Sequence, residues 1–391
     1  MLKRLVAIAV IFFGAGLAWM ILGQTLLART EDSNSSQTAR LSAQWGSAQN
    51  QDAPRVNGAG GEAVPLRSSN ITVNLDLEQR RKGLLWYNLY DVKFASHYLV
   101  RNDTKHRRLT LAFAFPATNG SYTDFALSIG GKRLSDTAAL GQGTFDFDLA
   151  PGAQTQIDIG YASRGMDSWA YHFGKGVQPV RDFSLTMNKN FDAIDFPPQT
   201  LLPVSEDRLG NAWRLHWHYA SLVTGNGIGM AFPVPLQPGP LAQRITFWAP
   251  VALLFYFFVM IVITTLRKIE LHPVNYFFLA AAFFAFHLLF AYLVDRIALE
   301  VAFVICALVS MFLTISYLRI VVGLRFAAVE SGLAQLVYLV LFSYALFNEG
   351  WSGLAITIGA ILTLFAVMQL TGGIRWSERF GNSMKADPAR G

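Results

Sequence analysis

Residues 247–266 read FWAPVALLFYFFVMIVITTL, a run without a single charged side chain. A helix of about 20 predominantly apolar residues is long enough to cross the hydrocarbon core of a bilayer. Four more apolar runs follow this one along the chain, and another lies at the N-terminus. The predicted transmembrane helices are residues 5-27, 245-266, 275-294, 298-318, 330-347 and 353-371. The chain is therefore expected to be a membrane protein with five spans in its C-terminal part.

The N-terminal apolar run follows two basic residues, Lys3 and Arg4. A cleavable signal peptide carries an apolar region of only about 7–15 residues. The run from Leu5 to Leu27 is longer than that, which predicts a signal anchor that stays in the membrane.

The basic residues that flank the predicted spans fall almost entirely on one side of the membrane. One outer turn holds Arg296 beside Asp295, and the other holds Asn348 and Glu349. Because Lys and Arg are enriched in cytoplasmic loops, we expect residues 1-4 and the tail 372-391 to be cytoplasmic and the long segment after span one to be exported. The basic residues on the inner side are Lys3, Arg4, Arg267, Lys268, Arg319, Arg325, Arg375, Arg379, Lys385 and Arg390.

The start of span five allows two interpretations. Residues 327–332 can extend the helix, or they can form an interfacial turn that contains Glu330.

Composition agrees with a chain that is half membrane-embedded. Mean hydropathy is +0.33, and 52% of the residues are hydrophobic. The net charge of +6 arises largely from the basic residues beside the spans, which argues against nucleic acid as a partner. Cys306 is the one cysteine and lies in span four, so the exported region cannot contain disulfides. A bacterial periplasm is the expected setting.

Residues 28-69 are rich in small and polar residues and are expected to form a stalk. Leu41, Trp45 and Ala48 recur at helical spacing, so part of the stalk is compatible with a short amphipathic helix.

From residue 70 the hydrophobic period changes to two. Ile71, Val73, Leu75 and Leu77 alternate with polar residues, as in half-buried antiparallel strands. Turn signals such as Gly130-Gly131 separate these segments. We expect an antiparallel β-sandwich-like domain over residues 70-240. Further strands are expected at 85–100, 108–115, 125–129, 145–149, 155–161, 183–188 and 213–219.

The segment from Phe232 to Pro240 contains four prolines. Each proline removes a backbone donor, so we expect a stiff extended lead into span two rather than a helix.

No catalytic set stands out, and the sequence predicts no catalytic residues, no metal site and no cofactor. His216 and His218 flank Trp217 at strand spacing, so both point to one face of a strand. Two histidines placed in this way can bind a metal ion, but we interpret them as strand residues that face the surface. The sequence contains neither a G-x-S-x-G nucleophile elbow nor a P-loop.

An aromatic cluster follows Arg164 in the predicted domain. Such side chains can stack on a sugar or a lipid headgroup, although packing in a core or an interface is the plainer interpretation. The cluster consists of Trp169, Tyr171, His172 and Phe173.

Ionisable groups inside a membrane are costly and often functional. His287 lies near the middle of span three, where it can act in a proton relay or simply form a hydrogen bond within the bundle. A second group of charges lies at the outer ends of the spans and is a candidate contact surface, with an ordinary solvated loop as the alternative. It comprises Asp295, Arg296, Glu300 and Glu349.

Several short strings occur in an order typical of one family. They are Trp45-Gly46 with Gln49 and Pro54, Phe196-Pro197-Pro198 with Leu202-Pro203, His272-Pro273 with Tyr276, and Asn348-Glu349 before Ala355. Together with the one-plus-five spans, these strings resemble the CreD-like inner-membrane proteins. The chain departs from the family pattern at Asp295-Arg296, where Glu-His is common, and at Arg375, where an acidic residue is common.

The resemblance implies an integral inner-membrane protein connected with envelope integrity and without an established reaction. The partners expected are the lipid bilayer and an unidentified envelope protein or lipid, and the pattern is compatible with an oligomer. One alternative is a sensor or accessory subunit that couples periplasmic binding to a membrane or cytoplasmic partner. A transporter is the third interpretation, because His287 lies at the depth where a transporter binds its substrate.

Overall fold

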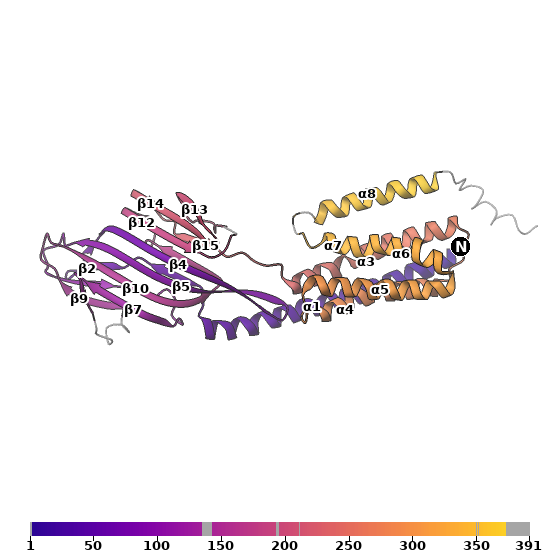
Figure 1. Cartoon of the computed structure of the whole chain (residues 1–391), viewed down its shortest axis with the longest axis horizontal. Helices are drawn as coiled ribbons and strands as arrows, with labels where there is room; N and C mark the ends of the chain where they lie inside the picture. Colours follow the sequence, from indigo (N-terminus) through magenta and orange to yellow (C-terminus); the bar gives the residue numbers. More distant parts are fainter. Residues whose placement is uncertain are drawn as a thin grey trace, which may run out of the picture. The chain divides into compact units, whose positions relative to one another are not determined.

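The computed structural model describes residues 2–134, 143–192, 195–210, 212–348, 350 and 352–372. Two compact units are distinguished (Figure 1). The helical unit contains Met1–Ser33, Gly83–Leu85 and Leu236–Gly391. The sheet-rich unit contains Asn34–Lys82 and Trp86–Pro235.

Long apolar helices make up the helical unit. They are α1 (Leu2–Trp45), α3 (Pro238–Leu266), α4 (Pro273–Leu293), α5 (Leu299–Val321), and α8 (Ser352–Thr371), with a composite helix before α8. Within the described residues, five helices are long and apolar enough to cross a membrane, and the apolar stretch Ile356–Gln369 of α8 is shorter. The predicted N-terminal apolar helix and the group of apolar C-terminal helices are confirmed.

Span five is an irregular helix in the structure. Its consecutive segments are η1 (Phe326–Ser331), α6 (Gly332–Gln335), η2 (Leu336–Leu341) and α7 (Phe342–Ala345), where η1 and η2 are π-helical. Residues 327–332 therefore extend the helix, and the interpretation as an interfacial turn is wrong. π-helical turns are rare and are frequently found at functional sites.

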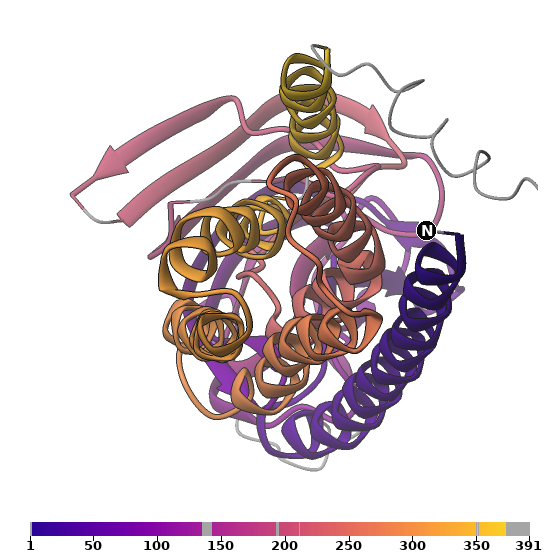
Figure 2. The ribbon, with the colours of Figure 1, turned by 90° about the vertical axis from the view of Figure 1, so that its right-hand side faces the viewer.

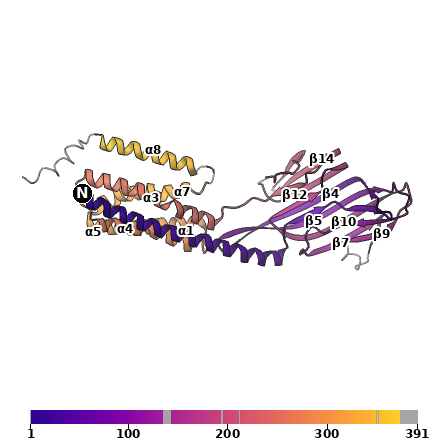
Figure 3. The ribbon, with the colours of Figure 1, turned by 180° about the vertical axis from the view of Figure 1, so that it is seen from behind.

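The helices share one hydrophobic core. Figure 2 shows the helices nearly end-on, with α8 at the periphery. Figure 3 shows α1 running alongside α4, and a ring contact joins the two helices. The indole of Trp19 on α1 meets Phe284 of α4 edge-on, with ring centroids 5.6 Å apart, and Trp19 is 1% exposed. The N-terminal helix is thus packed into the same core as the C-terminal helices.

Helix α3 begins earlier than predicted, at Pro238 rather than at residue 245. Pro238 and Pro240 lie in its first turn, where a helix has no use for their missing N–H donors. The predicted extended lead is therefore confined to the residues before Pro238.

Strands dominate the second unit. They are β1 (Gln49–Asp52), β2 (Arg55–Gly58), β3 (Ala63–Val64), β4 (Leu66–Lys82), β5 (Leu85–Arg101), β6 (Arg108–Ala112), β7 (Tyr122–Ile129), β8 (Lys132–Arg133), β9 (Thr144–Asp148), β10 (Gln154–Met166), β11 (Ser168–His172), β12 (Gln178–Lys189), β13 (Ser205–Leu209), β14 (Ala212–Thr224) and β15 (Ile228–Ala231). The predicted sheet-rich domain is confirmed, since all eight predicted strands lie within these elements or overlap them.

The strands form three sheets around one hydrophobic core. The largest has eight strands in the order β13-β14-β12-β4-β5-β10-β7-β8, and smaller sheets have the orders β3-β2-β6-β9 and β1-β11-β15. Most pairs are antiparallel, but β12 pairs with β4 in parallel and β1 pairs with β11 in parallel. Alternation places the apolar members of β4, such as Val73, in the core and leaves their polar neighbours outside.

The prediction of a stalk over residues 28-69 is wrong. Helix α1 continues to Trp45, because residues 28–45 contain neither Gly nor Pro to end it. Strands β1, β2 and β3 follow. β1 pairs with β11 and β2 with β6, both far along the chain, and β3 pairs with the neighbouring β2. Their short alternating patterns are weak in the sequence, and only these partners make them strands.

Candidate functional site

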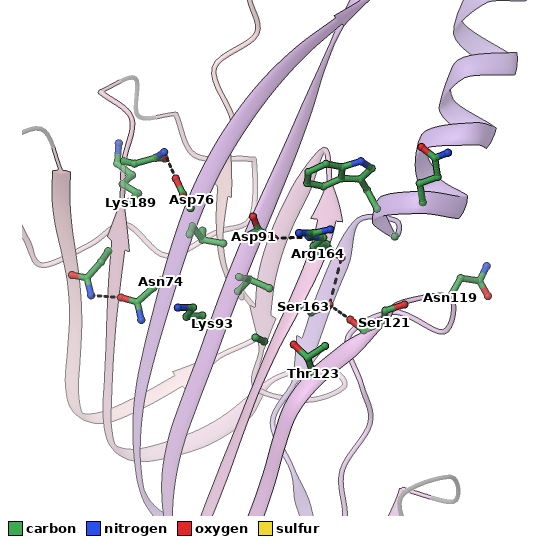
Figure 4. Close-up of a pocket in the computed structure, with 18 of the residues that line it drawn as sticks. Asn74, Asp76, Asp91, Lys93, Asn119, Ser121, Thr123, Ser163, Arg164 and Lys189 are labelled. Atoms are coloured by element: carbon green, nitrogen blue, oxygen red, sulfur yellow. Dashed lines mark hydrogen bonds and ion pairs between the residues drawn. The ribbon is translucent and has the colours of Figure 1, made fainter.

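A polar groove of about 1070 Å³ crosses the outer face of the eight-stranded sheet (Figure 4). It passes over β12, β4, β5, β10 and β7, and its floor is made by side chains that point away from the core. On β5, exposed Asp91 and Lys93 flank buried Val92. On β4, exposed Asn74 and Asp76 take the same orientation. The period of two therefore builds this polar surface from the same strands that form the core.

Pairs across neighbouring strands hold the floor of the groove in place. The Asn188 Nδ2 group donates to Asn74 Oδ1 at 2.8 Å, and the two residues are register partners on β12 and β4. Asn190 Nδ2 donates to Asp76 Oδ1. Such cross-strand pairs order the side chains before any ligand binds.

A charged pair lies at the groove's other side. Arg164 Nε donates to Asp91 Oδ1 at 3.0 Å, and the two residues are register partners on β10 and β5. Both side chains are more than half exposed, so the pair contributes little to stability. Lys93 lies near this ion pair, and its side chain points into the groove, where its ammonium group can donate hydrogen bonds.

Trp45 lines the groove at the end of α1. The guanidinium carbons of Arg80 and Arg164 lie 4.8 and 4.9 Å from its ring centroid, which is the geometry of a cation–π contact. The indole is therefore held by two strands of the sheet, β4 and β10. Trp45 was predicted as a family-motif position, and the structure places it at a candidate site.

Gly46 and Gln49 complete this wall. Gly46 has a φ of +90°, and a Cβ atom there would lie 2.7 Å from the backbone oxygen of Arg164. Gln49 is fully buried, and its Nε2 group donates to Ser163 Oγ at 2.9 Å and to the Arg164 backbone oxygen at 2.8 Å. The three motif residues thus converge on the segment of β10 that carries Arg164.

Lys189 contributes a buried cation to the groove's edge on β12. It is 2% exposed, and its ammonium group lies 4.2 Å from the ring centroid of Phe191 and donates to the Phe191 backbone oxygen. Burial lowers the pKa of Lys189 to about 8, while the carboxylates of Asp192 and Glu206 act in the opposite direction. Sequence reasoning missed this residue, since nothing in the strand pattern distinguishes it from an exposed lysine.

Of the two interpretations of the aromatic cluster, packing in a core describes Trp169 and Tyr171. Trp169 and Tyr171 are 0% and 1% exposed and belong to the core, while His172 and Phe173 are half-buried. The reason is that β11 lies between β1 and β15 and turns its aromatic side chains inward.

His216 and His218 share one face of β14, as predicted. Their rings stack with centroids 6.2 Å apart, and His216 Nδ1 lies 3.2 Å from Thr186 Oγ1. Within the described ranges, no group of three or more His, Cys, Asp or Glu residues is arranged to hold a metal ion.

His287 is buried within the helical unit. Its Nδ1 atom lies 3.0 Å from the backbone oxygen of Phe283, and its ring meets Trp19 edge-on with centroids 5.5 Å apart. A nitrogen that close to a carbonyl oxygen carries the proton, so Nε2 keeps the lone pair. Nε2 has no partner among the described residues. The hydrogen bond stays within α4, and both predicted roles of His287 stay predictions.

The predicted outer-rim cluster comes together only in part. Arg29 NH2 lies 3.2 Å from Asp295 Oδ2, its NH1 donates to the Ala291 backbone oxygen, and the guanidinium lies over Tyr292. Arg296 is the second, more distant partner of Asp295, at 3.7 Å. Sequence reasoning missed Arg29, although a basic residue directly after span one is a visible signal.

Two members of the predicted rim take no part in this contact. Glu300 lies in the first turn of α5, where its charge suits the positive end of the helix dipole, and the ion pairs within the described part of the chain do not include it. Glu349 lies outside the described residues.

The remaining family-motif residues have structural roles at the start of α4. His272 is the N-cap, and its Nδ1 accepts from Val274 N at 3.3 Å. Pro273 is the first residue of the helix, two residues before the predicted start of the span, and a proline there loses no helical hydrogen bond. Tyr276 is fully buried and meets Phe257 edge-on, with centroids 5.2 Å apart.

Comparison with known proteins identifies one family. Residues 212–377 match the model of the family described as inner membrane protein CreD. No curated protein matches the chain.

Among solved structures, a protein from Legionella pneumophila subsp. pneumophila str. Philadelphia 1, described provisionally as a nutrient binding protein, is 8% identical. The alignment covers 51% of this chain and 75% of that one, with a TM-score of 0.25. So low a TM-score carries no argument about fold or function. The family match, in contrast, supports a CreD-like inner-membrane family over residues 212–377, a range that includes the motifs at His272-Pro273 and Asn348-Glu349 but none of those before residue 212. The apolar helices fit an integral inner-membrane protein.

Proposed function

We propose that this protein is a non-enzymatic inner-membrane protein that supports the integrity of a bacterial envelope by binding an envelope protein or lipid headgroup through its sheet-rich unit. The groove over β12, β4, β5, β10 and β7 carries this proposal, because it is the largest of the described cavities and is lined mainly by polar side chains.

The chemistry of the groove favours a polar ligand of mixed or no net charge. Amide groups such as Asn74 lie beside carboxylates and beside the cations Lys93 and Arg164. A phosphate-rich ligand would favour a cluster of cations, and an apolar ligand would favour a less polar lining. The carboxylates of Asp76 and Asp91 are already engaged by Asn190 and Arg164, so the proposal assigns them recognition rather than acid–base catalysis.

The proposal places the sheet-rich unit on the periplasmic side and both termini in the cytoplasm. The distribution of basic residues beside the spans supports this orientation, since Arg267 and Lys268 follow α3 directly. The groove would then face envelope components that the cytoplasm does not contain.

Photocrosslinking in intact cells tests the proposal. We expect a benzophenone amino acid at Thr123, which lines the groove, to give a discrete adduct of the full-length protein. The same amino acid at Ser221, an exposed position on β14 outside the groove, is the matched control and should give none. The adduct should weaken at least several-fold in a Lys93→Glu background, because the substitution inverts the charge inside the groove.

Equal adducts at Thr123 and Ser221, or an adduct at Thr123 that is indifferent to Lys93→Glu, would contradict the proposal. A sensor that couples binding to another membrane protein is the alternative: it predicts that a membrane or cytoplasmic protein also co-purifies with the cross-linked protein in mild detergent.

A further inference from the structure

Five buried polar residues form a seam between α5, the irregular span five and α3. Tyr256 comes from α3, Ser310 and Thr314 come from α5, and Ser331 and Gln335 come from span five. Each is at most 1% exposed. Polar groups at this depth need partners because the hydrocarbon around the helices provides none.

Two hydrogen-bonded contacts define the register of the seam. Gln335 Nε2 donates to Ser310 Oγ at 2.8 Å, and Ser310 Oγ donates to the backbone oxygen of Ala282 at 2.7 Å. One turn away, the hydroxyls of Tyr256 and Ser331 lie 2.7 Å apart.

Thr314 falls between these contacts. Helix α5 and span five are consecutive helices joined by a short turn, so they run antiparallel. Thr314 lies one turn after Ser310 on the same face, and Ser331 lies one turn before Gln335. Gly332 supports this register, since a Cβ atom there would lie 3.5 Å from Ile315 Cδ1. Thr314 and Ser331 therefore face the same level of the seam.

The seam contains more hydrogen-bonding capacity than its own members use. Gln335 Oε1 and Thr314 Oγ1 are buried and have no partner among the described residues. Of the two hydroxyl hydrogens of Tyr256 and Ser331, one serves the bond between them, so the other needs an acceptor. One acceptor and up to two donors are thus left over at neighbouring levels.

We propose that the seam is a binding site for an ordered water molecule, which accepts from the spare hydroxyls and donates to Gln335 Oε1. Water is the molecule that fits this set, because it can accept two hydrogen bonds and donate two. A cation would take up the oxygens but leave the hydroxyl hydrogens without an acceptor, and the five seam residues include no carboxylate. The π-helical turns η1 and η2 flank the site, and ordered water is one of the means by which an irregular membrane helix satisfies its polar groups.

The proposal is tested by whether a substitution raises or lowers the melting midpoint of the full-length protein in lipid nanodiscs. If water joins Thr314 to Gln335, the change Thr314→Val removes one of its partners and should lower the melting midpoint by about 2 °C or more. In a dry seam the same change would remove an orphaned hydroxyl, and the midpoint would rise or stay the same. Thr264→Val is the matched control with an expected change near zero, because the buried Thr264 hydroxyl donates only to backbone carbonyls of its own helix, those of Met260 and Ile261, and its removal takes no partner from another buried side chain.

A comparison of two salts and an experimental structure complete the test. The midpoint in sodium chloride should equal that in choline chloride of the same ionic strength, and a sodium-specific rise that Thr314→Val abolishes would replace water by a cation and overturn the proposal. If Thr314→Val does not fold, a high-resolution structure of the unmodified protein decides. A density peak within hydrogen-bond distance of Gln335 Oε1 and a seam hydroxyl supports the site, and a direct bond between Thr314 and Gln335 without such a peak refutes it.

Discussion

At the scale of single residues, the candidate site depends on backbone positions as much as on functional side chains. Gly46 ends α1 and brings Trp45 against Arg80 and Arg164, and Gln49 ties the following strand to β10. Both residues were visible in the sequence only as members of a family motif. Their physical role became clear from the φ of Gly46 and the burial of Gln49.

We predict that Gly46→Ala destabilises the sheet-rich unit more than Gly61→Ala does. The two glycines have similar φ values, +90° and +85°, so both alanine variants carry about the same cost of the left-handed conformation. A Cβ at position 46 would lie 2.7 Å from a backbone oxygen, whereas nothing lies within 4 Å of one at position 61. The difference between the two variants in the free energy of unfolding should be about 1–3 kcal/mol, the usual cost of overpacking.

Chemical denaturation followed by the fluorescence of the full-length protein measures this difference. Equal free energies of unfolding for Gly46→Ala and Gly61→Ala would mean that the close approach of residue 46 to β10 is absent.

At the scale of elements, α1 belongs to the helix bundle through specific contacts as well as apolar packing. Its residue Arg29 makes an ion pair, a backbone hydrogen bond and a cation–π contact with the end of α4 and the turn after it. Trp19 packs against α4 further along the helix. Retention of α1 as a signal anchor stays a prediction.

Arg29→Gln should therefore lower the stability of the helical unit, whereas Arg296→Gln should not. The side chain of Arg29 is 32% exposed and that of Arg296 is 80% exposed, although both approach Asp295. Loss of a partly buried, charge-assisted hydrogen bond costs about 1.5–3 kcal/mol, and solvent screening at this degree of exposure reduces the expected loss to about 1 kcal/mol.

Thermal unfolding in detergent compares the two variants, and the double variant Arg29→Gln with Asp295→Asn tests the coupling. If the contact is real, the effects of Arg29→Gln and Asp295→Asn are less than additive. Fully additive effects would show that the two side chains do not interact.

At the scale of the whole molecule, the orientation across the membrane is the property on which the proposed function depends. Single cysteines can report it, because Cys306 is the one natural cysteine and is buried. In a Cys306→Ser background, we expect Thr123→Cys to react with a membrane-impermeant maleimide once the outer membrane is permeabilised. Lys268→Cys should react only after the inner membrane is opened. The reverse pattern would place the sheet-rich unit in the cytoplasm and remove the basis of the proposal.

The sequence alone determined which segments are apolar enough for a bilayer and which alternate as strands, because span length and side-chain period are local properties of the chain. It could not reveal the short strands β1 and β2, since their partners β11 and β6 lie far away in sequence, and β3 in turn pairs with β2.

Only the tertiary structure decided which polar residues meet. Arg29 forms an ion pair with Asp295, Arg164 lies over the ring of Trp45, and Gln335 donates to Ser310, although each pair is separated by many residues. The aromatic cluster at Trp169 and Tyr171 shows the converse, because its residue types suit a surface or a core and the neighbouring strands placed it in the core. Hydrophobic period decides which side of an element is buried, whereas long-range register decides what each polar side chain touches.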